Sequence, residues 1–109
     1  ARRNRAITLA SRVGKPVRVN VGGRIFQTTL DVLTQHEHSM LKTFIEVQLK
    51  QGKTEVFIDG DGDVFAYILS WLRRGVLPQE LSAYQTSLLL AEAEFWELDE
   101  LVAALTRAD

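Results

Sequence analysis

The pair Gly22-Gly23 lies between two short runs in which apolar and polar side chains alternate, and it restricts the possible folds more than any other feature. Residues 17–21 read Val-Arg-Val-Asn-Val, and residues 24–28 read Arg-Ile-Phe-Gln-Thr. Alternation with a period of two indicates a half-buried β-strand. Adjacent glycines supply the positive φ angles that a tight turn between two strands requires. The sequence therefore predicts a β-hairpin with its turn at the two glycines.

Glycine-rich loops also bind phosphate, so the same pair raises the question of a nucleotide site. A dinucleotide fingerprint needs a third glycine with a helix directly after it, and a P-loop needs Gly-Lys-Ser/Thr. The chain after Gly23 continues with a strand pattern instead. We therefore expect no cofactor at this turn.

The rest of the chain predicts one further strand and five helices. Residues 55–59 form the strand, and apolar spacings of three and four indicate helices at 30–34, 40–49, 64–75, 82–98 and 97–108. The order is two strands, two helices, one strand and three helices, which is typical of an α+β fold. We expect a small three-stranded sheet, made of the hairpin and the later strand, covered by about five helices.

The helix at 40–49 illustrates how these helices are predicted. Ser39 is placed to cap its start, as Thr28-Thr29 is for the preceding helix. Glu46 precedes Lys50 by four residues, a favourable ion-pair spacing. The predicted buried face consists of Met40, Leu41, Phe44, Ile45 and Leu49.

Length and composition predict one domain in a reducing compartment. A chain of 109 residues suits a single core, and the absence of cysteine excludes disulfides and zinc sites built on sulfur. We therefore expect a cytoplasmic protein. The apolar runs are far shorter than the roughly 20 residues that cross a bilayer, so no direct membrane insertion is expected.

The charges are unevenly distributed along the chain. Residues 1–18 contain six basic residues and no acid, whereas the remainder carries all 14 acids. We divide the chain into a basic arm, residues 1–15, expected to be flexible, and a domain, residues 16–109. The arm is either a solvated tail or a contact for an acidic partner, and because no aromatic residue lies among its arginines we expect no nucleic-acid binding. Five acids gather at residues 92–100, most simply as a solvated helix face and alternatively as a partner surface.

Two clusters suggest metal chemistry but lack the required pattern. Asp59, Asp61 and Asp63 resemble the start of a calcium loop, yet that loop needs glycine at its sixth position and glutamate at its twelfth, where this chain has Val64 and Ser70. The three aspartates are better explained as an acidic turn that caps the following helix.

The segment His36-Glu37-His38 has no third metal ligand within easy reach, and an exposed connector is the simpler interpretation. There is no Gly-x-Ser-x-Gly nucleophile motif. We therefore expect no metal site, no catalytic residue and no enzymatic activity.

Four ordered blocks resemble the potassium-channel tetramerization branch of the BTB/POZ fold. They are Val-Arg-Val-Asn-Val-Gly-Gly-Arg-Ile-Phe-Gln-Thr-Thr, Val-Leu-Thr, the segment from Phe57 to Pro78, and Ala-Glu-Ala-Glu-Phe-Trp-Glu-Leu. The likeness extends from about Pro16 to Leu105. It implies an intracellular module that assembles with itself into a homo-tetramer or homo-pentamer and catalyses no reaction.

The resemblance also implies roles for particular residues. Thr28 and Asp59 match the family's threonine and aspartate at the subunit interface. Gly60 replaces the arginine that usually follows this aspartate, which places the family's ring size in question. A cullin-binding surface would be expected around the second helix, at Phe44, Ile45 and Glu46, although Phe44 and Ile45 also fit the buried face.

The resemblance implies two functions, and a third applies if the chain lacks the family's ring. The Asn-Val-Gly-Gly block favours the soluble KCTD-like proteins, many of which are adaptors that bind cullin and present substrates for ubiquitination. The alternative is a cytoplasmic assembly domain of a voltage-gated potassium channel, of the kind without zinc. A monomeric interaction module is the third.

Overall fold

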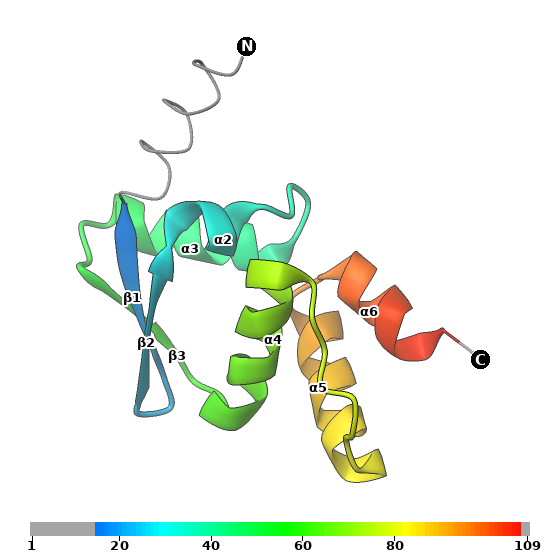
Figure 1. The fold of residues 1–109 in the computed structure, drawn as a ribbon. Helices are drawn as coiled ribbons and strands as arrows, with labels where there is room; N and C mark the ends of the chain where they lie inside the picture. Colours follow the sequence, from blue (N-terminus) through cyan, green and yellow to red (C-terminus); the bar gives the residue numbers. More distant parts are fainter. Residues whose placement is uncertain (1–14, 108–109) are drawn as a thin grey trace.

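The computed structural model describes residues 15–107, which form a three-stranded sheet and five helices (Figure 1). The elements in chain order are β1 (Pro16–Val21), β2 (Arg24–Thr29), α2 (Leu30–Thr34), α3 (Met40–Lys50), β3 (Glu55–Ile58), α4 (Gly62–Arg74), α5 (Ala83–Phe95) and α6 (Asp99–Thr106). The predicted α+β fold and the order of its elements are confirmed. Apart from Lys15, the predicted basic arm lies outside the described residues, and within them no helix is long and apolar enough to cross a membrane.

The sheet has the strand order β2-β1-β3, with β1 antiparallel to β2 and parallel to β3. The hairpin turns at Gly22 and Gly23, whose φ angles are 58° and 106°, values that favour glycine. Gly22 also lies against the loop after β3, because a Cβ atom at Gly22 would stand 2.2 Å from the carbonyl oxygen of Gly60. Both the backbone conformation and the close packing therefore require glycine at position 22.

Side-chain caps fix the starts of four helices. Thr29 and Ser39 accept hydrogen bonds from backbone N–H groups in the first turns of α2 and α3, as the sequence predicts. Asp61 caps α4, which confirms that the acidic turn has a capping role. Ser82 and Gln85 form a reciprocal capping box at the start of α5. Local sequence signals therefore place these helices along the chain.

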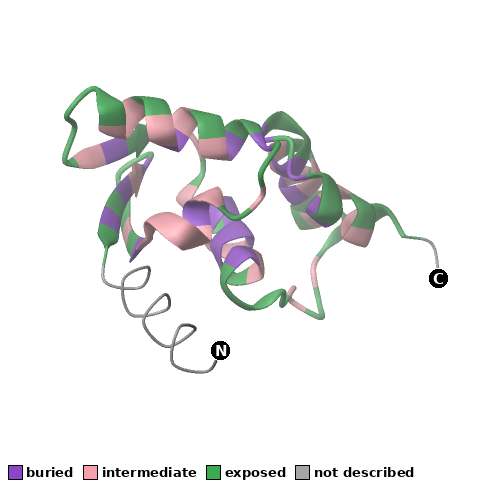
Figure 2. Ribbon diagram, turned by 90° about the horizontal axis from the view of Figure 1, so that it is seen from above, coloured by how far each residue is buried: buried purple, intermediate pink, exposed green. Residues whose placement is uncertain are grey.

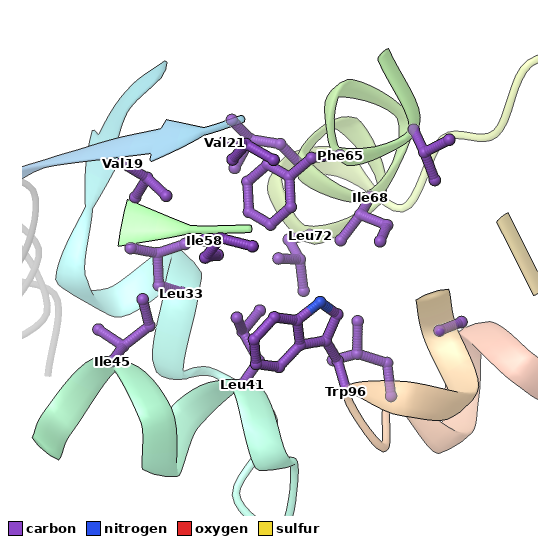
Figure 3. Packing of buried hydrophobic residues seen from close by; sticks show 14 of the residues in the cluster. Val19, Val21, Leu33, Leu41, Ile45, Ile58, Phe65, Ile68, Leu72 and Trp96 are labelled. Carbon is purple, nitrogen blue, oxygen red and sulfur yellow. The ribbon is translucent and has the colours of Figure 1, made fainter. Parts of the chain in front are cut away.

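The core extends from one face of the sheet, past α2, α3 and α4, to α5 and α6, which lie beyond α4 (Figures 1, 2 and 3). Phe65 of α4 lies near Val21 of β1, and Trp96 lies near Leu41 of α3 (Figure 3). The 18 apolar residues of this cluster are at most 5% exposed. They are Val17, Val19, Val21, Leu33, Leu41, Ile45, Val56, Ile58, Val64, Phe65, Ile68, Leu69, Leu72, Leu89, Ala93, Trp96, Leu98 and Leu101.

Two predictions for α3 are wrong. Met40 is 43% exposed and lies outside the buried face, which is centred on Leu41 and Ile45. Glu46 pairs with Lys42, one turn earlier, instead of Lys50. Both spacings are compatible with a helix, and the sequence alone does not choose between them because the choice depends on contacts from outside α3.

Candidate interaction surfaces

The outer sheet face is the side of the sheet opposite the core. It consists of Arg18, Asn20, Ile25, Gln27, Glu55 and Phe57. Asn20 pairs with Ile25 on one side and with Phe57 on the other, and these two apolar side chains are 45% and 54% exposed. Arg18 and Glu55 form the next row, with Nε and Oε1 3.5 Å apart. The face therefore presents two large apolar groups around an amide, beside one ion pair.

Thr28 and Asp59, the predicted interface residues, lie at opposite ends of the sheet. Thr28 pairs with Val17 at the start of β1, whereas Asp59 follows Ile58, the partner of Val21 at the end of β1. Thr28 is 7% exposed and lines a shallow hollow with Arg73 and Arg74, and Asp59 is exposed. One protomer does not bring the two side chains together.

The acidic turn before α4 is held by an arginine of the hairpin. Arg24 Nη1 donates to Asp63 Oδ1 at 2.8 Å, and the Arg24 guanidinium lies 4.9 Å from the centre of the Phe26 ring. Asp61 is engaged as the helix cap. Among residues 15–107, no three His, Cys, Asp or Glu side chains are grouped so that they could hold a metal ion.

His36 and His38, the other candidate ligands, have different surroundings. The His36 ring stacks on Trp71, with centroids 4.9 Å apart and planes 16° apart. Its Nδ1 lies 3.8 Å from Glu100 Oε1. His38 is exposed. The connector interpretation applies to His38, whereas His36 belongs to a junction between α4 and α6.

The three residues predicted for a cullin surface point in different directions from α3. Ile45 is fully buried in the core. Phe44 is half-buried and packs against Trp96, with ring centroids 5.4 Å apart. Glu46 pairs with Lys42. Only Phe44 and Glu46 therefore reach the surface.

Phe44 belongs to an exposed apolar area that we call the Trp96 patch, made of Met40, Phe44, Val47 and Phe95. Met40, Val47 and Phe95 are 43%, 45% and 65% exposed. Phe95 packs edge-on against Trp96 with centroids 4.9 Å apart, and the Met40 N–H donates to the Trp96 carbonyl at 2.9 Å. The buried indole thus packs against the rings of Phe44 and Phe95, and Met40 is linked to Trp96 through the backbone.

Sequence reasoning missed most of this patch. Met40, Phe44 and Val47 follow the spacing of a second apolar stripe on α3, a signal present in the sequence but assigned in part to the core. Phe95 follows roughly 50 residues later in the chain, and no local pattern links it to α3. Helix α5 gives one further indication, because it carries apolar residues around its circumference although only Leu89 and Ala93 are buried.

The charges differ between the α5–α6 side and the α3 side of the Trp96 patch. Residues 75–106 contain Glu80, the five acids at 92–100 and no basic residue. In contrast, Lys42 on α3 lies between two carboxylates, with Nζ 3.4 Å from Glu37 Oε1 and 3.3 Å from Glu46 Oε2. The hydrogen bond with Glu46 is the largest cause that raises the pKa of Lys42, and the Glu37 charge adds to it. The α5–α6 side of the Trp96 patch is therefore acidic without compensation from its own segment.

Comparison with known proteins identifies the family. A family model described as the BTB/POZ domain matches residues 17–105. The chain is 43% identical over 94 residues to an FH protein interacting protein, FIP2, of Arabidopsis thaliana, with 82% of this chain and 31% of that protein covered. It is 36% identical over 93 residues to the BTB/POZ domain-containing protein KCTD21 of mouse and of human, covering 83% of this chain and 36% of each relative.

The chain thus spans about a third of the length of these relatives. BTB/POZ domains of this branch are interaction modules that generally self-associate, and they form a family without enzymatic activity. The hairpin, the capped α4 and the match over residues 17–105 agree with this assignment. The chain belongs to the BTB/POZ domain family, in its KCTD-like branch.

Proposed function

We propose that this domain assembles into a closed ring of four or five copies and serves as the scaffold of a soluble adaptor protein. The observation that carries the proposal is the outer sheet face, where Ile25 and Phe57 are about half exposed on either side of Asn20. Burying such side chains against a second copy removes apolar surface from water, which stabilises association.

The exposed Asp59 and the hollow at Thr28 provide two different surfaces for the contacts of a ring. A ring forms through head-to-tail contacts, which join two different surfaces of identical subunits. Asp59 is exposed at one end of the sheet, whereas Thr28 is 7% exposed at the other end, where it lines a hollow with Arg73 and Arg74. Asp59 then meets a polar group of the next copy, and the contact sets the register of the ring.

Native mass spectrometry and light scattering over a concentration series test the assembly. We expect a tetramer or pentamer for the native chain and a shift toward monomer for both Phe57→Lys and Asp59→Arg. Val76→Lys is the matched control, because Val76 is 58% exposed on the loop after α4, away from the sheet. A native chain that stays monomeric contradicts the proposal, as does a ring that Phe57→Lys leaves unchanged.

The Trp96 patch supports cullin as the partner of this adaptor. Two of its aromatic side chains, Phe44 and Phe95, pack on a buried tryptophan, and exposed Met40 and Val47 lie nearby on α3, a composition common at the centres of protein interfaces. Glu94 and Glu97 beside Phe95 favour a partner surface that is apolar with basic residues at its rim. The name of FIP2 describes a protein that interacts with an FH protein, which also agrees with a binding role.

Binding of purified cullin to the assembled domain, measured by calorimetry, tests this partner. Phe95→Ala is expected to weaken binding at least tenfold, as is typical of a central interface aromatic. Tyr84→Ala removes an equally exposed aromatic side chain from the other end of α5 and should leave affinity unchanged. Absence of binding by the native chain at micromolar concentration rejects cullin while leaving ring assembly intact. The channel alternative predicts transmembrane segments elsewhere in the full-length sequence.

A further inference from the structure

The Trp96 patch is an uncovered apolar surface in the part of the chain that the structure describes. Met40 and Val47 of α3 are 43% and 45% exposed, and Phe95 at the end of α5 is 65% exposed. Large apolar side chains that gather on one surface are typical of a binding site. An occupant of the patch therefore has to supply apolar side chains of its own.

The acids beside this patch lack basic partners within residues 15–107. Glu94 directly precedes Phe95, Glu97 follows it by two residues, and both acids are exposed. Neither acid takes part in the ion pairs among these residues. Since complementary charge favours association, the occupant is expected to be basic as well as apolar.

The basic arm of the same chain has this composition. Residues 1–14 contain four arginines and no acid. Three of these arginines lie at positions 2–5, and the apolar residues Ile7 and Leu9 follow them. The arm therefore places a basic cluster next to a short apolar segment, as the patch places acids next to apolar side chains.

The start of β1 brings this segment within reach of the patch. Strand β1 is parallel to β3, with Arg18 opposite Glu55, and residues 51–54 connect β3 to the end of α3. The start of β1 therefore lies near the C-terminal end of α3 (Figure 1). At about 3.3 Å per residue, residues 1–14 extend up to about 46 Å, whereas α3 is about 16 Å long. The arm is long enough to follow α3 and to continue to Phe95.

We propose that the basic arm lies along α3 and covers the Trp96 patch of its own protomer. Leu9 and Ile7 contact the apolar side chains of α3, and the arginines at positions 2–5 pair with Glu94 and Glu97. The arm and an external partner exclude each other, so the arm lowers the apparent affinity of that partner. Competition with cullin rests on the proposed function, whereas the contact between arm and patch does not.

Paramagnetic broadening of the Met40 methyl signal tests this contact. Met40 is the only methionine of the chain, and the chain has no cysteine. Isotope labelling of methionine therefore gives one signal at the patch, and Ala6→Cys carries one nitroxide label in the arm. We expect the label to cause loss of the Met40 signal at low salt, and about 0.5 M NaCl to restore much of it.

Two outcomes of this measurement overturn the proposal. One is a Met40 signal that the label leaves unchanged at low salt. The other comes from a mixed sample, in which the nitroxide and the labelled methionine are on different chains. This sample should show no broadening, and broadening as strong as within one chain means that the arm covers a neighbouring copy instead.

Glu94→Gln and Glu80→Gln form a matched pair of variants. Each removes one exposed acid from residues 75–106, but Glu80 precedes α5, at the end opposite Phe95. Glu94→Gln should reduce the broadening, and Glu80→Gln should leave it unchanged. Equal effects of the two variants contradict the pairing of the arm with the acids beside the patch.

Cullin binding measured by calorimetry tests the competition separately. Replacing the arginines of the arm, in the triple variant Arg2→Ser, Arg3→Ser and Arg5→Ser, should abolish most of the broadening. It should also raise the affinity for cullin about three- to tenfold, as expected when the arm covers the patch roughly 70–90% of the time. Unchanged affinity rejects the competition. Broadening without any cullin binding rejects cullin as the partner and supports the arm contact.

Discussion

The sheet end of the molecule and the α5–α6 end differ in whether their acidic side chains have basic partners. Around the sheet, Arg18 pairs with Glu55 and Arg24 with Asp63, so these two acids each have a base from another element. Residues 75–106 have six acids and no base. The sheet end thus pairs acids with bases within one chain, whereas α5 and α6 present charge of a single sign beside exposed Phe95.

The apolar residues follow the same division. The sheet alternates strictly, with valines of β1 buried on one face and polar or half-exposed residues on the other. Helix α5 is apolar around its circumference but buries one side only, a pattern expected of a helix with neighbours on more than one side. Only the inner face of the sheet is therefore committed to the core of the protomer, whereas the outer face of the sheet and the outer side of α5 both keep large apolar side chains exposed.

The sharpest test of this division uses the two sides of α5. Leu89 is fully buried and Tyr84 is 73% exposed. We expect Leu89→Ala to lower the free energy of unfolding by about 3 kcal/mol, because it removes buried methyl groups and leaves a cavity. Tyr84→Ala should change it by less than about 0.5 kcal/mol. Urea denaturation measures both, and comparable losses would mean that the outer side of α5 already stabilises the protomer.

The hairpin turn gives the next largest effect. Gly22→Ala introduces a Cβ atom 2.2 Å from the Gly60 carbonyl oxygen at a φ of 58°, so we expect a loss of about 2–3 kcal/mol. Gly75→Ala is the control, because Gly75 has a φ of 70° with no atom near the new Cβ, and should cost about 1 kcal/mol. Equal losses in urea denaturation would show that the backbone angle alone requires glycine at position 22.

Sequence patterns predicted the parts of the fold whose causes are local. The Gly22-Gly23 turn and the caps at Ser39 and Asp61 each depend on residues within a few positions of one another. The Trp96 patch and the His36–Trp71 stack join residues about 35 to 55 positions apart, and no periodicity encodes such a meeting. The interface roles of Thr28 and Asp59 stay predictions, because they depend on a second copy of the chain.

A charge reversal at the sheet end and one on α5 are expected to change the free energy of unfolding in opposite directions. Glu55→Lys replaces an ion pair with Arg18 by a repulsion and should lower the free energy of unfolding by up to about 1 kcal/mol. Glu94→Lys places a base in the acidic segment near the C-terminal end of α5, and should raise it by a few tenths of a kcal/mol. Denaturation at low salt and in 0.5 M NaCl should show both changes shrinking with salt, and a shared sign would contradict the comparison.

The smallest expected effect concerns Lys42, the base that α3 places between two acids. Glu46→Gln removes the largest cause that raises the pKa of Lys42, so the pKa should fall toward its ordinary value, and Glu37→Gln should lower it less. Because the folded-state pKa is the higher one, the stabilisation is present below the unfolded-state value of about 10.4 and is lost as pH rises through the folded-state pKa. NMR titration of the Lys42 side chain measures the shifts, and urea denaturation from pH 8 to 11.5 should show the native chain and Glu46→Gln converging at the alkaline end. A larger shift in Glu37→Gln would reverse the assignment and make the loop carboxylate, instead of the helical pair, the main partner of Lys42.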